Sequence, residues 1–341
     1  MINNRESEEM NGHLNLVDRF GRNHDYLRIS VTDRCNLRCH YCVPEGQHQC
    51  MDFSKLLTDD EIVQIVKVGA KLGISKIRIT GGEPLLRKNL PELIRRIKSI
   101  PTIEDIALTT NGVFLKKFGY KLKEAGLNRV NISLDSLDEK KFSYITRDGH
   151  LKDVLEGIQT AVELGFNPIK LNVVLMKDFN VDEVEDFLLW TIREPINIRF
   201  IEYMPIGQAN KSWSNQYQSL KLVEEIAERI APYKPVTTNK NNGPADQFSF
   251  KNAKGTFGLI HPISCDFCDH CNRLRLTADG HLKPCLFWQD EVSLRQFMDN
   301  EQQLVHAFKK AMFIKPERHQ MGDENFNFGN PTTRVMSAIG G

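Results

Sequence analysis

The sequence predicts an α/β fold: a partial (βα)6 barrel, like part of a TIM barrel, followed by a C-terminal cap domain. Two observations predict the barrel. Strand-like apolar runs alternate with amphipathic helical segments from residue 26 to residue 203, as in parallel sheets with right-handed crossovers. The strands alternate apolar with polar residues, so one face of the sheet is polar. A third observation, the loss of this rhythm after Tyr203, predicts the C-terminal unit.

Six short apolar runs bounded by turn residues are expected as strands. They lie near Tyr26–Val31, Ile74–Thr80, Asp105–Thr109, Arg129–Leu134, Ile169–Val174 and Ile196–Tyr203. Helical patterns fill the gaps near Asp59–Leu72, Leu90–Ile100, Phe114–Ala125, Leu151–Leu164 and Val181–Trp190. The first helix has the clearest start and stop, because Thr58 and Glu61 form a capping-box pattern and Gly73 follows its end. A further helix is expected near Leu220–Ile230.

The charged residues at the polar positions of the expected strands are mostly cations. Arg28, Arg78 and Lys170 each stand between apolar residues. Covering such charges with helices would cost several kcal/mol each unless they were paired. A curled sheet with helices only on its outside, enclosing a polar lumen, avoids that cost. About six strands are too few to close as an eight-stranded barrel does.

Composition places the chain among ordinary globular proteins. Its 341 residues are 40% hydrophobic and 26% charged, and 45 Lys plus Arg against 44 Asp plus Glu give a formal net charge of +1. This balance, with no recognition helix or basic stripe, argues against a nucleic-acid partner. No run of about 18 apolar residues occurs, and the polar start lacks the apolar core of a signal peptide. We therefore expect a cytoplasmic protein without a membrane partner.

The eight cysteines fall into two clusters along the chain, and the first follows the first strand. Cys35, Cys39 and Cys42 come at the carboxyl end of that strand, where parallel barrels place their active sites. Three thiolates can hold three irons of a [4Fe–4S] cluster and leave the fourth iron free. The alternative is a structural zinc site, for which His40 or Cys50 would supply the fourth ligand.

With Tyr41 before its last cysteine, this group resembles the hallmark of the radical S-adenosylmethionine (SAM) superfamily. The segment Gly81-Gly82-Glu83-Pro84, at the end of the second strand, is similar to the motif that binds the SAM amino group in that superfamily. The resemblance implies one-electron reduction of SAM by the cluster, which gives methionine and a 5′-deoxyadenosyl radical that abstracts hydrogen from the substrate. The SAM contacts that it implies are Tyr41, Gly82, Glu83, Ser133 and Met204.

The second cysteine group is Cys268, Cys271 and Cys285, with Arg273 and Arg275 after its first pair. The segments LRISVTDRCNLRCHYC, KIRITGGEPLLR and CNRLRLTADG, with the final Gly-Gly, resemble the molybdenum cofactor biosynthesis protein A family, the GTP 3′,8-cyclases. The resemblance runs from about Tyr26 to the end of the chain. It implies a second [4Fe–4S] cluster whose open iron binds the guanine of GTP.

The activity that the resemblance implies is conversion of GTP to 3′,8-cyclo-7,8-dihydro-GTP, the first step of molybdenum cofactor biosynthesis. A triphosphate carries roughly three to four negative charges and needs cationic partners. The GTP contacts implied are Arg28, Lys76, Arg78, Thr109, Lys170, Arg199, Arg273, Leu274 and Arg275. The family places its terminal glycines in the active site, so the expected catalytic set is Arg28, Arg78, Gly340 and Gly341. Single cations could instead pair with lumen carboxylates such as Asp135.

Cys265 stands three residues before Cys268 and offers the second group a fourth thiolate. Four thiolates would close the cluster or make a structural zinc site. We expect Cys265 to be a bystander, because the spacing to Arg273 and Arg275 fixes the family register on Cys268. Cys50 matches no motif.

The expected organisation is an N-terminal tail (1–24), a radical SAM partial barrel (25–204), a C-terminal auxiliary-cluster domain (205–330) and a tail ending in Gly-Gly (331–341). The resemblance further implies a flavodoxin-type reductant, the next enzyme of the molybdopterin pathway as a partner, and a homodimer. Two rival functions remain. One is another radical SAM enzyme with auxiliary clusters, such as a peptide or sulfatase maturase. The other is a zinc- or iron–sulfur-binding regulator that contacts nucleic acid.

Overall fold

The computed structural model describes residues 15–43, 50–147, 149–206, 213–236, 243–265, 267–321 and 331–340. Its strands form one sheet in the order β12-β11-β10-β1-β2-β3-β4-β5-β6-β9-β8-β7. Between its ends the order of β1 to β6 follows the chain, and each of these strands pairs in parallel with the next. The predicted α/β class with a parallel sheet is therefore confirmed.

All six predicted strands are present, with ends shifted by one or two residues. They are β1 (Tyr26–Ser30), β2 (Lys76–Thr80), β3 (Asp105–Thr110), β4 (Arg129–Ser133), β5 (Ile169–Leu175) and β6 (Ile196–Glu202). The alternation in sequence separates their two faces. Leu27, Ile29 and Ile77 are fully buried in the core between sheet and helices, whereas Arg28 and Arg78 line a cavity on the other face.

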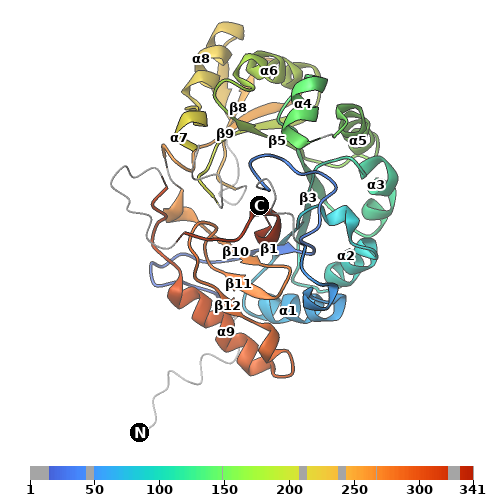
Figure 1. The fold of residues 1–341 in the computed structure, drawn as a ribbon, viewed down its shortest axis with the longest axis vertical. Coiled ribbons are helices and arrows are strands. Elements are labelled where there is room, and N and C mark those ends of the chain that lie inside the picture. The colour runs from blue at the N-terminus through green and yellow to red at the C-terminus, as the bar shows by residue number, and fades with distance from the viewer. Residues whose placement is uncertain are drawn as a thin grey trace.

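Helices connect these strands and lie along the outside of the curved sheet (Figure 1). They are α1 (Asp59–Lys71), α2 (Leu90–Lys98), α3 (Leu115–Glu124), α4 (Glu139–Thr146), α5 (Leu151–Glu163) and α6 (Val184–Arg193). The capping box before α1 forms as predicted, since Thr58 and Glu61 bond each other's backbone N–H. Sequence analysis missed α4, a helix of eight residues with three buried side chains.

The chain after β6 adds strands to both edges of this sheet. β9 pairs in parallel with β6, and β10 pairs in parallel with β1. The elements of this part are α7 (Trp213–Gln216), α8 (Lys221–Ile230), β7 (Tyr233–Pro235), β8 (Asp246–Phe250), β9 (Thr256–Ile260), β10 (Arg273–Leu276), β11 (His281–Lys283), β12 (Val292–Ser293), α9 (Glu301–Ile314) and α10 (Met336–Ile339).

The sequence predicts a C-terminal domain or cap, and in the structure the chain after β6 supplies both ends of the sheet. The strands of this part are only two to five residues long and do not alternate regularly with helices, so the sequence did not predict them individually. The C-terminal end of the chain returns to the middle of the ring of helices, close to β1 and β10 (Figure 1). None of the described helices is long and apolar enough to span a bilayer.

Candidate active site

A cavity of about 350 Å³ lies on the polar face of the sheet. It extends from residues at the beginnings of strands, such as Tyr26 and Lys76, to the loops that follow the strand ends. Six of the eight cysteines line it: Cys35, Cys39, Cys42, Cys268, Cys271 and Cys285. Cys50 and Cys265 do not line it, and Cys265 is exposed. The fold therefore brings the two predicted cysteine groups to one space.

The loop after β1 carries the first cysteine group. Burial raises the pKa of Cys39, and the neighbouring Cys42 raises it further. Burial and Cys35 likewise raise the pKa of Cys42 to about 12. Because three crowded thiolates repel one another, a cationic partner would stabilise them. Tyr41 in the same loop donates a hydrogen bond of 2.8 Å to Asp135, so this carboxylate holds the loop and not a lumen cation.

The Gly-Gly-Glu-Pro segment after β2 lies directly against the start of this loop. The backbone N–H of Gly82 donates to Thr32 O at 2.7 Å, and that of Glu83 donates to Arg34 O at 2.7 Å. A Cβ on Gly82 would lie 2.3 Å from Arg34 O, a distance that no side chain permits. The glycine thus lets the two backbones meet and fixes the chain that leads into Cys35.

Glu83 is buried and ties the ends of β2 and β3 together. Its carboxylate accepts hydrogen bonds from Thr110 Oγ1 (2.7 Å), the Asn111 N–H (2.8 Å) and the Leu85 N–H (3.0 Å). Burial raises its pKa to about 7. Of the other residues that the resemblance assigns to SAM, the structure brings Tyr41, Gly82, Ser133 and Met204 to the same cavity.

The second cysteine group is surrounded by cationic side chains. Lys315 Nζ lies 3.7 Å from Cys271 Sγ and donates to the carbonyl oxygens of Pro284 and Arg273. Arg22 donates to Cys268 O at 2.8 Å. Burial alone would raise the pKa of Cys271, but Lys315 and Arg273 lower it to about 6.

The cysteines fit iron–sulfur clusters better than isolated ions. Within the described ranges, no three His, Cys, Asp or Glu side chains are arranged to hold one metal ion. In a [4Fe–4S] cluster each thiolate binds its own iron, so the three sulfurs need not converge on one point. Cys35, Cys39 and Cys42 would hold one cluster, and Cys268, Cys271 and Cys285 have the same number of thiols for another.

Three arginines stand side by side across neighbouring strands. Arg275 of β10 is in register with Arg28 of β1, which is in register with Arg78 of β2. Burial and Arg275 lower the pKa of Arg28, and burial lowers that of Arg275 to about 10. Like charges directly opposite on one face of a sheet destabilise it. This arrangement is suited to a polyanion that lies across all three guanidinium groups.

The remaining cations differ in how they are neutralised. Lys76 Nζ lies 2.7 Å from Asp25, so it has a carboxylate partner. In the part of the chain that the structure describes, Arg78 and Arg199 form no ion pair with a carboxylate, and Arg199 Nη2 has no hydrogen-bond partner. Thr109 lines the cavity 3.3 Å from Arg78 Nη1, and Arg273 lines it too.

Two residues with predicted GTP contacts lie outside the cavity wall. Lys170 is buried and does not line the cavity, although it has the same parity in β5 as the lining residue Asn172. Burial and Arg199 lower its pKa to about 6. Leu274 is opposite Leu27 in the sheet, and its side chain packs in the apolar core. Its side chain is therefore not positioned to touch a ligand in the lumen.

Sequence analysis missed Tyr26 and Arg129 as lining residues. Tyr26 accepts a hydrogen bond from Arg78 Nε, and Arg129 Nε donates to Asp105 at 3.0 Å. Burial raises the pKa of Tyr26, but Arg78 and the other nearby arginines lower it overall. The sequence could have indicated Tyr26, because it stands two residues before Arg28 and so faces the same side of β1.

The C-terminal tail also reaches this region. The carbonyl oxygen of Gly340 accepts a hydrogen bond of 2.6 Å from Arg275 Nη1. Gly340 has a φ of +69°, and a Cβ there would lie 2.6 Å from Thr80 Cγ2. A glycine is therefore required at this point. Met336 and Ser337 line the cavity, while Gly341 lies outside the described residues.

Two family models match the chain. The radical SAM superfamily model matches residues 29–191, and the model described as Molybdenum Cofactor Synthesis C matches residues 196–321. A GTP 3′,8-cyclase of Listeria monocytogenes is 53% identical over 330 residues, which cover 96% of this chain and 99% of that protein. A GTP 3′,8-cyclase of Lactiplantibacillus plantarum is 46% identical with the same coverage.

Solved structures share the fold. Streptococcus suis SuiB aligns with a TM-score of 0.58 at 15% identity, over 86% of this chain and 69% of that one. SuiB bound to S-adenosylmethionine aligns with a TM-score of 0.57, also at 15% identity, over 84% and 68%. Fold, cysteine-lined cavity and near-complete alignment with the cyclases agree: the chain belongs to the GTP 3′,8-cyclase family of the radical SAM superfamily.

Proposed function

We propose that this chain is a GTP 3′,8-cyclase that converts GTP to 3′,8-cyclo-7,8-dihydro-GTP in molybdenum cofactor biosynthesis. The observation that carries the proposal is the row formed by Arg275, Arg28 and Arg78, which share one register across β10, β1 and β2. Three adjacent guanidinium groups match a triphosphate in charge and in their capacity for paired hydrogen bonds. These arginines line the same cavity as both cysteine groups, a combination that a general radical SAM active site does not require.

The residues of the chain bind and orient the reactants. The cluster on Cys35, Cys39 and Cys42, when bound, supplies the one-electron chemistry that cleaves SAM into methionine and a radical. Arg28, Arg78 and Arg275 hold the triphosphate in the cavity. Orientation matters because a displacement of about 1 Å can cost a factor of about 100 in rate.

The second cysteine group would hold a second [4Fe–4S] cluster with one open iron for the guanine base. Cys268, Cys271 and Cys285 provide three thiols, and Lys315 beside Cys271 compensates negative charge there. The guanine would thereby be anchored at one end of the cavity while the arginine row anchors the phosphates. Two anchors fix the 3′ carbon of the ribose relative to carbon 8 of the base.

The finer organisation is proposed on the same basis. Residues 25–204 would act as the partial barrel, and residues 205–330 as the auxiliary-cluster part that shares its sheet. A flavodoxin-type reductant, the next enzyme of the molybdopterin pathway and a second copy of the chain are proposed partners in the cytoplasm.

Anaerobic reconstitution tests the proposal. We expect two four-iron clusters per chain, SAM cleavage that depends on GTP, and a cyclised product identified by mass spectrometry. SAM cleavage that is indifferent to GTP would point to a maturase-like enzyme instead. If only one cluster is found per chain, the proposed guanine-binding site does not exist and the proposal fails.

Deletion of Gly340 and Gly341 tests the tail. The deletion leaves both cysteine groups intact, so iron content is expected to match the full chain. Cyclisation is expected to be lost, because the contact between Gly340 and Arg275 is gone. Normal turnover by the shortened chain would contradict a catalytic role for the tail.

A further inference from the structure

The last ten described residues lie along the second cysteine loop before they enter the lumen. The N–H of Thr332 donates to Phe287 O at 2.7 Å, and Pro331 forms a β-bridge with Trp288. α10 follows, with Ile339 fully buried, and the segment ends at the contact between Gly340 and Arg275. The position of Gly340 therefore depends on how the residues before it are fixed.

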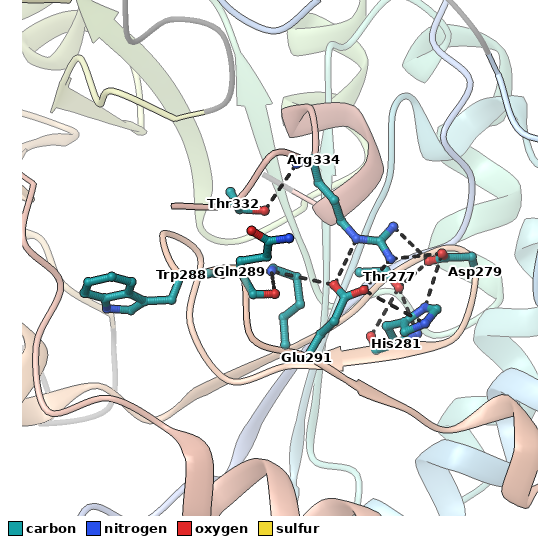
Figure 2. A network of polar contacts seen from close by, with 9 residues as sticks. Thr277, Asp279, His281, Trp288, Gln289, Glu291, Thr332 and Arg334 are labelled. Atoms are coloured by element: carbon teal, nitrogen blue, oxygen red, sulfur yellow. Dashed lines mark hydrogen bonds and ion pairs between the residues drawn. The ribbon is translucent and has the colours of Figure 1, made fainter. Parts of the chain in front are cut away.

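Arg334 makes four hydrogen bonds to carboxylates. Its Nε and Nη2 donate to Glu291 at 2.9 and 2.7 Å, and its Nη1 and Nη2 donate to Asp279 at 3.2 and 3.0 Å. Figure 2 shows the guanidinium group between the two carboxylates. Four hydrogen bonds to two carboxylates use the planar fork of arginine, which a lysine cannot reproduce.

The two carboxylates are themselves held in place (Figure 2). Asp279 accepts from Thr277 Oγ1 at 2.5 Å, and His281 Nδ1 lies 3.2 Å from it. Glu291 lies 3.7 Å from Nζ of Lys283, a side chain with no exposed surface. The two carboxylates that bind Arg334 therefore belong to the turns of the three-stranded β10–β12 unit and are held by its own residues.

The same unit carries Arg275, on β10. Beyond the contacts of Pro331 and Thr332 at its start, the C-terminal segment is thus attached to the β10–β12 unit through Arg334 and through Gly340. We propose that Arg334 is a positioning residue for the Gly-Gly terminus: its ion pairs with Asp279 and Glu291 set the distance over which the tail reaches Arg275. The proposal rests on the proposed function, since the tail matters for cyclisation only if this chain cyclises GTP.

Arg334→Met is the direct test, because methionine keeps much of the apolar stem and removes the guanidinium group. We expect both clusters to remain, and the rate of product formation to fall by about tenfold or more while SAM is still cleaved. Hydrogen exchange of the amides of residues 336–340 should become faster. Arg334→Lys should recover only part of the rate. If Arg334→Met keeps a normal iron content and forms product at the wild-type rate, the proposal is overturned.

A matched control is Arg295→Met. Arg295 likewise bridges a carboxylate, Glu61, and carbonyl oxygens, those of Lys55 and Leu56. It forms no hydrogen bond or ion pair with residues 331–340, the part of the tail that the structure describes. This variant should keep the wild-type rate and the wild-type exchange of residues 336–340. An equal loss in both variants would show a general packing defect and would also overturn the proposal.

Combination with the deletion of Gly340 and Gly341 separates positioning from general destabilisation. The shortened chain is expected to form no product, so its SAM cleavage and its thermal stability are compared. If Arg334 acts through the terminus, Arg334→Met should change neither quantity further in the shortened chain. A further loss of SAM cleavage or of thermal stability in the shortened chain would contradict the proposal. Faster exchange of residues 336–340 in Arg334→Met, together with a wild-type chain that forms no cyclised GTP, would show that the attachment is real and the proposed function wrong.

Discussion

Lys170 illustrates how a single buried residue can report on the ligand. Burial and Arg199 lower its pKa from 10.5 to about 6 on the face of β5 that is turned to the cavity. Between these two values the unfolded chain binds more protons than the folded one, so the free energy of unfolding falls as the pH drops from about 10 to about 6. Below that range Lys170 adds no further pH dependence. An anion nearby reverses the shift, because it stabilises the ammonium form.

We therefore predict that GTP binding at pH 7.5 takes up a proton at Lys170. Calorimetric titration of GTP in buffers of different ionisation enthalpy measures this uptake. Lys170→Met should abolish it, whereas Lys76→Met should retain it because Lys76 already faces Asp25 at 2.7 Å. Identical uptake in wild type and Lys170→Met would show that another group titrates.

Cys265 provides a second prediction for a single residue. It is exposed and does not line the cavity, although it lies three residues from Cys268. We expect Cys265→Ala to leave iron content and activity unchanged, and Cys268→Ala to lose the second cluster. Iron analysis and electron paramagnetic resonance of the reduced protein distinguish the two variants. Loss of the second cluster in Cys265→Ala would show that Cys265 is a ligand of that cluster.

At the scale of elements, the residue that follows α9 supports the second cysteine group. Lys315, directly after the helix, is buried and donates to the carbonyl oxygens of Arg273 and Pro284 beside Cys271. Lys315→Met should therefore weaken retention of the second cluster and leave the first in place. Iron release to a chelator, followed over time, measures the effect. The exposed pair Lys71–Glu301, at the start of α9, offers the control Lys71→Met, which should retain both clusters.

Individual strands show how far the sequence was informative. Polar residues at alternate positions in β1 and β2 predicted which side chains would face the lumen, because a strand points successive side chains to opposite faces. The partners of β1 at its other edge could not be predicted. β10 is only four residues long, Arg273–Leu276, and 242 residues separate its start from the end of β1. Nothing local in such a short run specifies a partner so distant in sequence.

The candidate site shows the same division. Motif spacing identified Cys35, Cys39 and Cys42, and the structure brings them to the cavity. The arginine row was visible only as separate polar positions, because register between strands belongs to the tertiary fold. The residues that support the ligands, such as Lys315 and Arg334, carry no motif of their own. Their roles follow only from contacts between segments far apart in the chain.

At the scale of the whole molecule, the sheet makes the two halves of the chain depend on each other. β1 and β6 both have their outer edges covered by strands from the C-terminal half, β10 and β9. Removing that half would expose two rows of unpaired N–H and C=O groups, which are prone to intermolecular pairing. The cavity would also lose the second cysteine group and Arg275.

We predict that residues 1–204 alone do not form a stable monomer, and that the full chain unfolds in a single cooperative transition. Size-exclusion chromatography measures the oligomeric state of the fragment, and thermal circular dichroism measures how cooperatively the full chain unfolds. A chain lacking only residues 331–341 is the matched control, since it loses α10 and the tail but no named strand, and it should keep a cooperative transition. A monomeric 1–204 fragment with its own sharp transition would show that the barrel half folds independently. The shared sheet would then be an association of two stable units, and the arginine row would form only when they meet.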